Sequence, residues 1–309
     1  MNSNVSSSFL KIRRGKDKIE YFSKGILSSS LYSIGMNANS AMEIANHVEQ
    51  TMGELEDPVP RKKLIKTITD EIEKIDRRLA ERYKIHEGDG NYKPIVILLA
   101  GVPGIGKSTI SSRLSQRLEI SSIIGTDMIR EILRQTISPK LVPELHCSSY
   151  DAYKYLKSKL NPILRQSIVG YEEQCRHIIV GVEAAIQSAL YSRESTIIEG
   201  VHLAPNILQS SILENPHILM FLLYLEDEEE HSTRIRTRGS SIVKRSADRY
   251  ISAFSEIRNI QTYLVEEATK LGLHMIETSI SSKAIGKMMD LIWDRIIELE
   301  KLEKGKEKS

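Results

Sequence analysis

The distribution of hydrophobic residues changes about ninety residues into the 309-residue chain. From there on, short apolar runs alternate with longer segments in which apolar residues recur every three or four positions. We expect strands at 95–100, 122–125, 195–199, 218–225 and 273–276. Helices are expected at 107–118, 127–136, 149–160, 164–191, 204–213, 247–271 and 283–301. This alternation predicts an α/β fold in which helices cover both faces of a parallel sheet.

The first ninety residues follow a different pattern, in which two short strand-like pieces precede three amphipathic helices. The turn RRGKD at 13–17 separates the strand-like pieces, and a helix that begins at Lys24 closes at Gly35. A second helix is expected over 39–55, with its inward positions at Met42, Ile44, Ala45 and Val48. A third covers 63–85, with a helical rhythm at Leu64, Ile65, Ile68, Ile72, Ile75 and Leu79.

The stretch HEGDGNYKP at 86–94 carries the glycines, acid and proline of a linker. We therefore expect two domains, a small and mostly helical one at 8–90 and an α/β domain at 91–309.

Residues 95–109 read IVILLAGVPGIGKST, a strand-like run followed by a glycine-rich turn and a helix-like segment. Gly101, Gly106, Lys107 and Ser108 satisfy the pattern G-x-x-x-x-G-K-[ST]. In such a turn the backbone N–H groups surround anionic oxygens, and the following helix adds the positive end of its dipole. The pattern predicts a nucleoside-triphosphate site formed by Gly101, Val102, Pro103, Gly104, Ile105, Gly106, Lys107, Ser108 and Thr109. Lys107 is expected to reach the β- and γ-phosphates, and Ser108 to bind Mg²⁺.

Two acidic residues follow other predicted strands, where ligands of open parallel sheets bind. Asp127 lies in IIGTDMIREIL and is expected either to cap the helix that starts at Met128 or to lie opposite the phosphate loop, near Mg²⁺ or the acceptor hydroxyl. Glu199 ends the run STIIE and is expected to bind a water of the Mg²⁺ shell beside the substrate. His202, three residues later, is interpreted as a hydrogen-bonding loop histidine rather than as a base.

The segment 226–250 reverses charge sharply, because five acids at 226–230 precede six bases. The acids are interpreted as a solvated helix face. The bases are Arg234, Arg236, Arg238, Lys244, Arg245 and Arg249, and the turn RGSS at 238–241 divides them into two clusters. This arrangement predicts a helix–loop–helix lid at about 230–250 that closes over a triphosphate, with Arg238 and Arg249 as catalytic candidates.

Composition narrows the possibilities further. The net charge of +2 does not demand nucleic acid as a partner. Cys147 and Cys175 are the only cysteines and form no C-x-x-C pair, so neither a disulfide framework nor a zinc site is indicated. The longest apolar run found in the second half of the chain, ILMFLLYL at 218–225, is too short to cross a membrane, and a reducing cytoplasm is the expected compartment.

The motifs GVPGIGKST, GTDMIRE, VGVEA and IIEGVHL occur in the order and spacing of a known family over about 93–295. This part of the chain resembles the 2-phosphoglycerate kinases of archaea, which have a P-loop kinase fold. The resemblance implies transfer of the ATP γ-phosphate, with Mg²⁺, to 2-phosphoglycerate, which gives 2,3-bisphosphoglycerate on the way to cyclic 2,3-diphosphoglycerate. The acceptor carries a phosphate and a carboxylate, so its pocket needs several arginines, and the candidates are Arg130, Arg134, Arg176, Arg249 and Arg258.

Within this reading, Asp127 is expected to orient the acceptor hydroxyl or to take its proton. For Arg176 an acceptor contact and a surface position are equally good interpretations. Two alternatives stay open for the whole protein, namely a kinase of another small acid and a nucleotide-sensing regulatory ATPase.

The first ninety residues are similar to an ATP-cone, a small nucleotide-binding regulatory module. The similarity lies in LKIRRGKDKIEYFSKGILSSSLYSIGM and in DEIEKIDRRLAERY. The chain departs from the usual cone, since RRGKD replaces a common Lys-Arg-Asp-Gly turn and Ser23 stands where an acid is frequent. The resemblance implies a nucleotide effector at this domain.

Overall fold

The computed structural model describes residues 10–14, 18–53, 58–88, 93–156, 165–242 and 244–306; side chains are not described at 53, 238–247 and 303–306. Two compact units result, one from residues 1–92 with 296–309 and the other from 93–295. The single helix α12 (Ser281–Lys306) contributes residues to both. Each unit is described by itself below.

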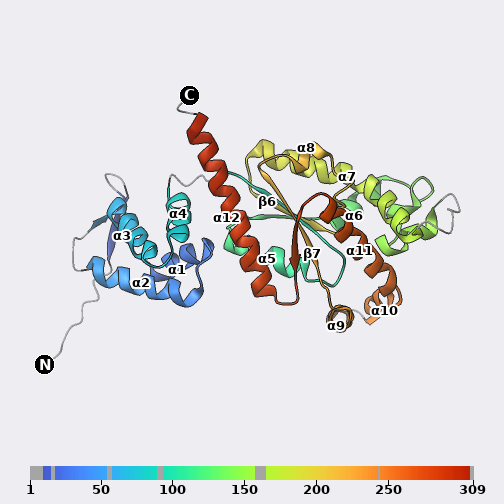
Figure 1. The fold of residues 1–309 in the computed structure, drawn as a ribbon, viewed down its shortest axis with the longest axis horizontal. Helices are drawn as coiled ribbons and strands as arrows, with labels where there is room; N and C mark the ends of the chain where they lie inside the picture. Colours follow the sequence, from blue (N-terminus) through green and yellow to red (C-terminus); the bar gives the residue numbers. More distant parts are fainter. Residues whose placement is uncertain are drawn as a thin grey trace. The chain divides into compact units, whose positions relative to one another are not determined.

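The larger unit is built on a five-stranded sheet whose described pairings are all parallel (Figure 1). Its strands are β4 (Val96–Ala100), β5 (Ser122–Gly125), β6 (Thr196–Gly200), β7 (Ile218–Tyr224) and β8 (His274–Glu277), in the order β5-β6-β4-β7-β8. The predicted α/β class is confirmed. Every residue of β4 is buried, because this strand lies in the middle of the sheet with helices around it.

The chain reverses its direction of strand addition around β4. It runs from β4 to β5 and β6 on one side and then crosses to β7 and β8 on the other. In open α/β sheets such a reversal opens a crevice at the carboxyl ends of the strands, where ligands bind. The fold therefore directs a ligand to the turn that follows Ala100.

The helices of this unit are α5 (Lys107–Arg117), α6 (Thr126–Thr136), α7 (Gln166–Ser192), α8 (Ser210–Leu213), α9 (Glu228–Ile242), α10 (Lys244–Ser252), α11 (Phe254–Lys270) and α12. Two 3₁₀ segments, η1 (Pro143–His146) and η2 (Ser149–Tyr155), lie between α6 and α7. The helix expected at 149–160 is thus a 3₁₀ segment as far as Tyr155, and 157–160 lie outside the described residues.

Three further helix predictions need correction. The helix expected over 204–213 is α-helical only at α8, because turns that end on the Ala204 carbonyl precede it. The helix expected over 247–271 is two helices, α10 and α11, with Ala253 between them. The RGSS sequence does not form the turn of a flap, since α9 runs through 238–241 and ends at Ile242. Glycine and serine cost a helix about 1 kcal/mol or less each, which the rest of α9 tolerates.

The smaller unit consists of a three-stranded sheet and helices. Strands β1 (Lys11–Arg14), β2 (Lys18–Tyr21) and β3 (Val59–Pro60) are ordered β2-β1-β3. The helices are α1 (Lys24–Ser33), α2 (Ala38–Gly53), α3 (Arg61–Glu73) and α4 (Arg77–His86). Of the predicted second helix, 54 and 55 lie outside the described residues, as do 15–17 of the turn and 89–92 of the linker.

The single helix predicted over 63–85 was wrong, because the chain breaks after Glu73. The Asp76 carboxylate accepts hydrogen bonds from the amides of Arg78 and Leu79 and so starts α4. Ile75, expected inward, lies in the break and is 62% exposed. Met42, also expected inward, is exposed on α2.

Candidate active site

The turn after β4 has the geometry of a phosphate-binding loop. Gly101 and Gly104 adopt φ values of +152° and +87°, a region that side chains rarely allow. A Cβ at Gly101 would lie 2.7 Å from the Leu223 carbonyl oxygen, and one at Gly104 would lie 2.5 Å from Cγ1 of Ile235. Helix α5 then starts at Lys107 with no side chain capping it. The start of such a helix is a position where backbone amides and the helix dipole favour an anion.

Lys107 and Ser108 open helix α5 next to the end of β6. Lys107 Nζ donates a 2.9 Å hydrogen bond to the Val102 carbonyl within its own loop, and the Ser108 hydroxyl donates one of 2.8 Å to Glu199. Strand pairing places Glu199 between Leu99 of β4 and Gly125 of β5. The residues after three neighbouring strands therefore meet at one edge of the sheet.

A hydroxyl and a carboxylate at this contact suit Mg²⁺, which prefers oxygen ligands. No group of three or more metal-binding side chains gathers in the part of the chain that the structure describes. That is compatible with Mg²⁺, which usually keeps several waters and binds through one or two carboxylates plus substrate phosphates. The donor set fits a metal that arrives with a nucleotide.

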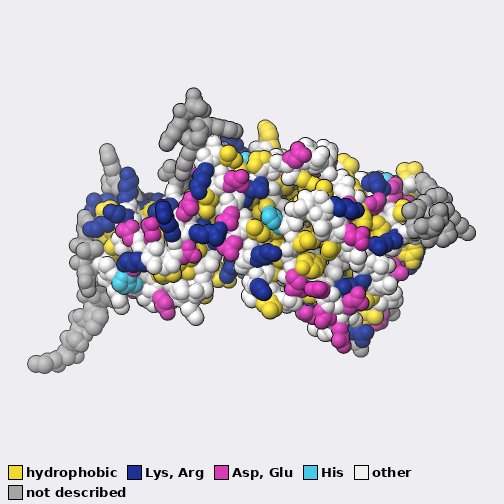
Figure 2. Space-filling model, viewed as in Figure 1, with side chains coloured by type: hydrophobic (Ala, Val, Ile, Leu, Met, Phe, Trp, Pro, Cys, Tyr) yellow, Lys and Arg dark blue, Asp and Glu magenta, His cyan; other side chains and the backbone are white. Residues whose placement is uncertain are grey.

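Helix α9 packs directly on the phosphate loop through His231, which the sequence analysis did not single out, and through Arg234, one of the bases of the predicted lid. His231 is buried, and its Nε2 lies 2.8 Å from the Pro103 carbonyl. Burial lowers the pKa of His231. Arg234 donates to the carbonyls of Ile105, Thr278 and Ser279 at 3.4, 3.0 and 2.8 Å. The preceding acids 226–229 are exposed, and Figure 2 shows acidic side chains gathered over this region.

His231 gave no sequence signal of its own, because a lone histidine after an acidic run is compatible with a solvated helix. His231 lies against the phosphate loop because helix α9 packs closely on Gly104 through Ile235 and His231.

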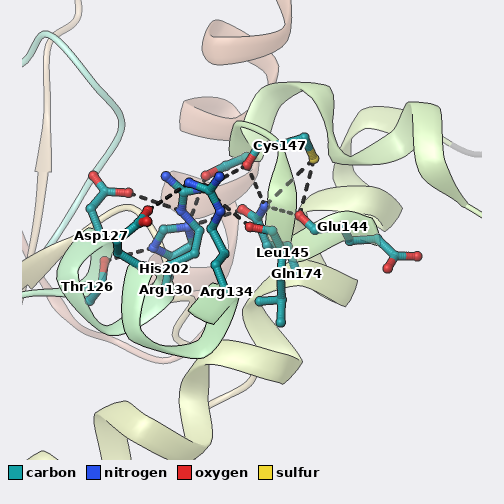
Figure 3. A network of polar contacts seen from close by, with 11 residues as sticks. Thr126, Asp127, Arg130, Arg134, Glu144, Leu145, Cys147, Gln174 and His202 are labelled. Carbon is teal, nitrogen blue, oxygen red and sulfur yellow. Dashed lines mark hydrogen bonds and ion pairs between the residues drawn. The ribbon is translucent and has the colours of Figure 1, made fainter. Parts of the chain in front are cut away.

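Helix α6 carries the next group of predicted residues (Figure 3). It begins at Thr126 with Gly125 before it and no side-chain cap, so the capping role considered for Asp127 was wrong. The Asp127 side chain is 76% exposed, and its Oδ1 lies 3.5 Å from Nε of Arg130. Arg130 also donates from NH1 to the carbonyls of Leu145 and Cys147, at 3.4 and 3.0 Å.

Arg134 follows Arg130 by one helical turn and lies on the same face of α6. Its NH1 donates a 2.7 Å hydrogen bond to Glu131. In the described structure the Nε atoms of Arg130 and Arg134 are buried and make no hydrogen bond. Buried guanidinium nitrogens of this kind favour an anionic partner, and the Asp127 carboxylate already lies 3.5 Å from Nε of Arg130.

The other predicted arginines lie apart from this group. Arg176 is 51% exposed and pairs with Glu172 and Glu173 of its own helix α7. Arg258 donates to the carbonyls of Leu225 and Glu226, at 2.7 and 3.0 Å, and so braces the segment that leaves β7. Arg249 is exposed on α10, and the side chain of Arg238 lies outside the described residues.

His202 lies just beyond β6, is fully buried and contacts α6, η2 and α7. Burial lowers its pKa to about 4. The interpretation as a hydrogen-bonding histidine agrees with these contacts.

The fold and the site together define a P-loop protein of the kinase type. The central strand leads into a glycine-rich phosphate loop, and the neighbouring strand ends in an acidic residue bonded to the loop's serine. No helix in the described part of the chain is long and apolar enough to cross a membrane.

Curated archaeal relatives are similar to this chain over most of its length. The 2-phosphoglycerate kinase of Pyrococcus furiosus is 37% identical, and the match covers 94% of this chain and 94% of that protein. Those of Methanocaldococcus jannaschii and Methanopyrus kandleri are 35% and 33% identical, over 94% and 91% of this chain and 94% and 86% of their own. The chain belongs to the 2-phosphoglycerate kinase family.

No protein-family model matches the chain. Among solved structures, a gluconokinase from Sinorhizobium meliloti is similar with a TM-score of 0.40 and 14% identity, over 69% of this chain and 99% of that one.

Proposed function

We propose that the protein transfers the γ-phosphoryl group of ATP to the free hydroxyl of 2-phosphoglycerate, which yields 2,3-bisphosphoglycerate and ADP. Membership of the family supports this substrate pair. The observation that carries the proposal is the Ser108–Glu199 contact between the phosphate loop and β6, where Glu199 pairs with Gly125, the residue before the arginine-bearing helix α6. The bond from the γ-phosphorus to the bridging oxygen breaks as the bond to the acceptor oxygen forms.

The nucleotide would lie on the phosphate loop, residues 101–109, with its β- and γ-phosphates on the amides at the start of α5. Lys107 would release the Val102 carbonyl and bind the phosphates instead. Ser108, Glu199 and Asp127 would hold Mg²⁺, which neutralises charge on the phosphates when bound. The Ser108–Glu199 hydrogen bond holds both groups in place before ligand arrives.

The acceptor would lie along α6. Its carboxylate and phosphate need several cationic donors, which Arg130 and Arg134 supply from one helix face. Asp127 would accept the hydrogen bond of the attacking hydroxyl and its proton on transfer. Because the transition state is loose, position and charge neutralisation matter more here than the basicity of Asp127.

We assign supporting roles to the remaining predicted residues. Residues of about 230–250 would form the lid, with Arg238 and Arg249 reaching the transferring group as it closes. Arg176 and Arg258 would complete the anion-binding surface, and Glu199 would face the substrate through the Mg²⁺ shell. Arg176 and Arg258 would have to exchange their present partners for ligand, since both are engaged with other groups.

A panel of acceptors tests the substrate. Purified protein is incubated with Mg·ATP and with 2-phosphoglycerate, 3-phosphoglycerate, shikimate, gluconate or a nucleoside monophosphate, and ADP release is followed. We expect turnover with 2-phosphoglycerate far above the other acids. Preferred turnover of shikimate or gluconate would overturn the substrate assignment, and ATP binding without transfer to any acid would favour the regulatory alternative.

We further propose that residues 8–90 form a regulatory domain that binds a nucleotide effector, while 91–309 form the kinase domain. A pocket of about 130 Å³ in the smaller unit supports this; its lining includes Arg14, Tyr21, Ser30, Arg61, Tyr83 and Glu87. Arg61 pairs with Glu87 at 3.0 Å, and hydrogen bonding to His86 lowers the pKa of Glu87 to about 2. The pocket thus combines an apolar wall with fixed charges.

The number of nucleotides bound per chain tests this second proposal. Calorimetry with a non-hydrolysable ATP analogue should find two sites in the wild-type protein and one in Lys107→Ala. A single site in the wild-type protein that disappears in Lys107→Ala would contradict the effector site and leave the kinase proposal standing.

A further inference from the structure

His202 joins three elements that surround the proposed acceptor site. Its Nδ1 lies 2.8 Å from Oγ1 of Thr126, the first residue of α6. Its Nε2 lies 3.1 Å from the amide oxygen of Gln174 on α7 and 3.1 Å from the hydroxyl of Ser149 in η2. Figure 3 shows the ring between α6 and the segment that carries Glu144 and Cys147.

The partners of Gln174 determine which ring nitrogen carries the proton. Its Nε2 donates to the carbonyls of Glu144 and Cys147, at 2.5 and 3.1 Å, so its amide oxygen faces His202 as an acceptor. Nε2 of His202 is therefore the donor, and Nδ1 accepts from the Thr126 hydroxyl. Burial keeps the ring neutral, which leaves Nδ1 free to accept.

The same network continues into the residues assigned to the acceptor. Asp127 follows Thr126 directly, and Arg130 lies one turn further along α6. The Cys147 carbonyl accepts from both Gln174 and Arg130, at 3.1 and 3.0 Å. Helix α6 is thus attached at Thr126 to His202 and at Arg130 to the 143–147 segment.

The packing of β6 on α6 leaves little room for any other arrangement. A Cβ at Gly200 would lie 1.7 Å from Oγ1 of Thr126, so the helix start approaches the strand backbone closely. If the side chain at position 202 could not accept a hydrogen bond, the buried Thr126 hydroxyl would lose its acceptor. An unsatisfied buried donor of this kind costs about 1–3 kcal/mol.

We propose that His202 is a positioning residue for phosphoryl transfer, acting through its Nδ1 bond to Thr126 to fix the first turn of α6 and hence Asp127 and Arg130. This rests on the proposed function of that site. His202 is fully buried and would act without touching nucleotide or acceptor, by setting where α6 presents its carboxylate and guanidinium. A displacement of about 1 Å in such groups can lower turnover about 100-fold.

Two conservative variants separate the two sides of the ring. In His202→Asn the side-chain oxygen occupies a place near Nδ1 and still accepts from Thr126. In His202→Gln the amide nitrogen occupies a place near Nε2 and keeps the bonds to Gln174 and Ser149 instead. Thr126→Ser and Thr126→Val form a matched pair on the other side of the bond, with and without a hydroxyl.

The measurements are kcat/KM for the acceptor, the affinity for an ATP analogue and thermal unfolding. We expect His202→Gln and Thr126→Val to lose about 10- to 100-fold in acceptor kcat/KM, with ATP-analogue affinity within about twofold. His202→Asn and Thr126→Ser should retain most activity. The double variant His202→Gln/Thr126→Val should be no worse than either single one, because one bond is lost in all three.

Hydrogen exchange separates a failure of this inference from a failure of the proposed function. Amides of α6 should exchange faster in Thr126→Val than in Thr126→Ser, while those of α5 stay unchanged, whatever the protein phosphorylates. Unchanged exchange in α6, or equal losses of ATP and acceptor binding, would overturn the positioning role. Absence of transfer to any acid, with the α6 effect intact, would overturn the function alone.

Discussion

Lys107 is the single residue on which the nucleotide assignment depends most. Its ammonium donates a hydrogen bond to the Val102 carbonyl of the phosphate loop. Lys107→Ala should therefore lower kcat/KM by about 100-fold or more while the melting temperature changes little. Lys140→Ala, at an exposed lysine, is the matched control and should keep full activity. Retained activity in Lys107→Ala would remove the lysine from the mechanism.

Arg130 has a structural contact as well as a proposed substrate contact. Lysine at this position keeps the charge but cannot supply a planar fork to two partners. Arg130→Lys should raise the acceptor KM by about tenfold or more, at about 1–3 kcal/mol for a charged hydrogen bond, with little change in ATP affinity. Steady-state kinetics against both substrates measure this, with Arg193→Lys, at an exposed arginine to which no ligand contact is assigned, as the surface control. Equal weakening of both substrates would place Arg130 in the wrong pocket.

His202 also makes stability depend on pH. Burial lowers its pKa from 6.5 to about 4, while the Asp127 carboxylate nearby raises it and Arg130 and Lys107 lower it. Between these values the unfolded chain binds more protons, so the free energy of unfolding should fall as pH falls from 6.5 toward 4. At about 1.4 kcal/mol per pH unit, the contribution is about 3 kcal/mol. Urea titrations at a series of pH values give the free energy of unfolding. This free energy should fall more steeply with falling pH for the wild type than for His202→Asn, and only in this pH range.

At the scale of secondary structure, the contact between β6 and α6 is the tightest link to the site. Gly200→Ala would push a methyl group against Thr126 and should cost about 1–3 kcal/mol of stability, with a larger loss of activity. Gly286→Ala in α12 meets no atom within 4 Å and should instead stabilise by about 0.5–1 kcal/mol. Chemical denaturation of both variants checks this. A neutral Gly200→Ala would mean that α6 is not held closely to β6.

Elements whose signal is local were predictable. The five strands of the larger unit were expected within one residue of their observed ends, because buried runs bounded by glycine or polar residues carry their own boundaries. Helix breaks that depend on a capping side chain could not be predicted in this way. The Asp76 cap divides a segment whose apolar rhythm continues through Ile75, and α9 continues through RGSS because its packing on the phosphate loop outweighs weak propensities.

The candidate site divides in the same way. Lys107 and Ser108 follow from spacing alone, and Glu199 from its place at a strand end. His231 and the His202 network depend on contacts between segments far apart in sequence, such as Pro103 with His231 and Thr126 with His202. The local sequence pattern does not predict contacts between distant segments. His202 was therefore interpreted only as a hydrogen-bonding histidine of a loop.

The whole chain combines an α/β unit that carries the phosphate loop with a smaller unit that has its own core. The smaller unit buries Leu31, Ile34, Val48 and Ile72, so apolar packing of its own stabilises it. The relatives from Pyrococcus furiosus and Methanocaldococcus jannaschii match 94% of this chain, a length that includes most of this unit. A role in regulation is therefore a property to test in the full-length protein.

The transfer of phosphate itself is the measurement that bears most directly on this account. Stoichiometric enzyme is mixed with Mg·ATP labelled in the γ-phosphate and with 2-phosphoglycerate, and the products are separated and examined by phosphorus NMR. The account predicts that the label appears in 2,3-bisphosphoglycerate in the wild-type protein, and at least about 100-fold more slowly in Lys107→Ala. Label that appears only as inorganic phosphate, or transfers equally fast in Lys107→Ala, would contradict it.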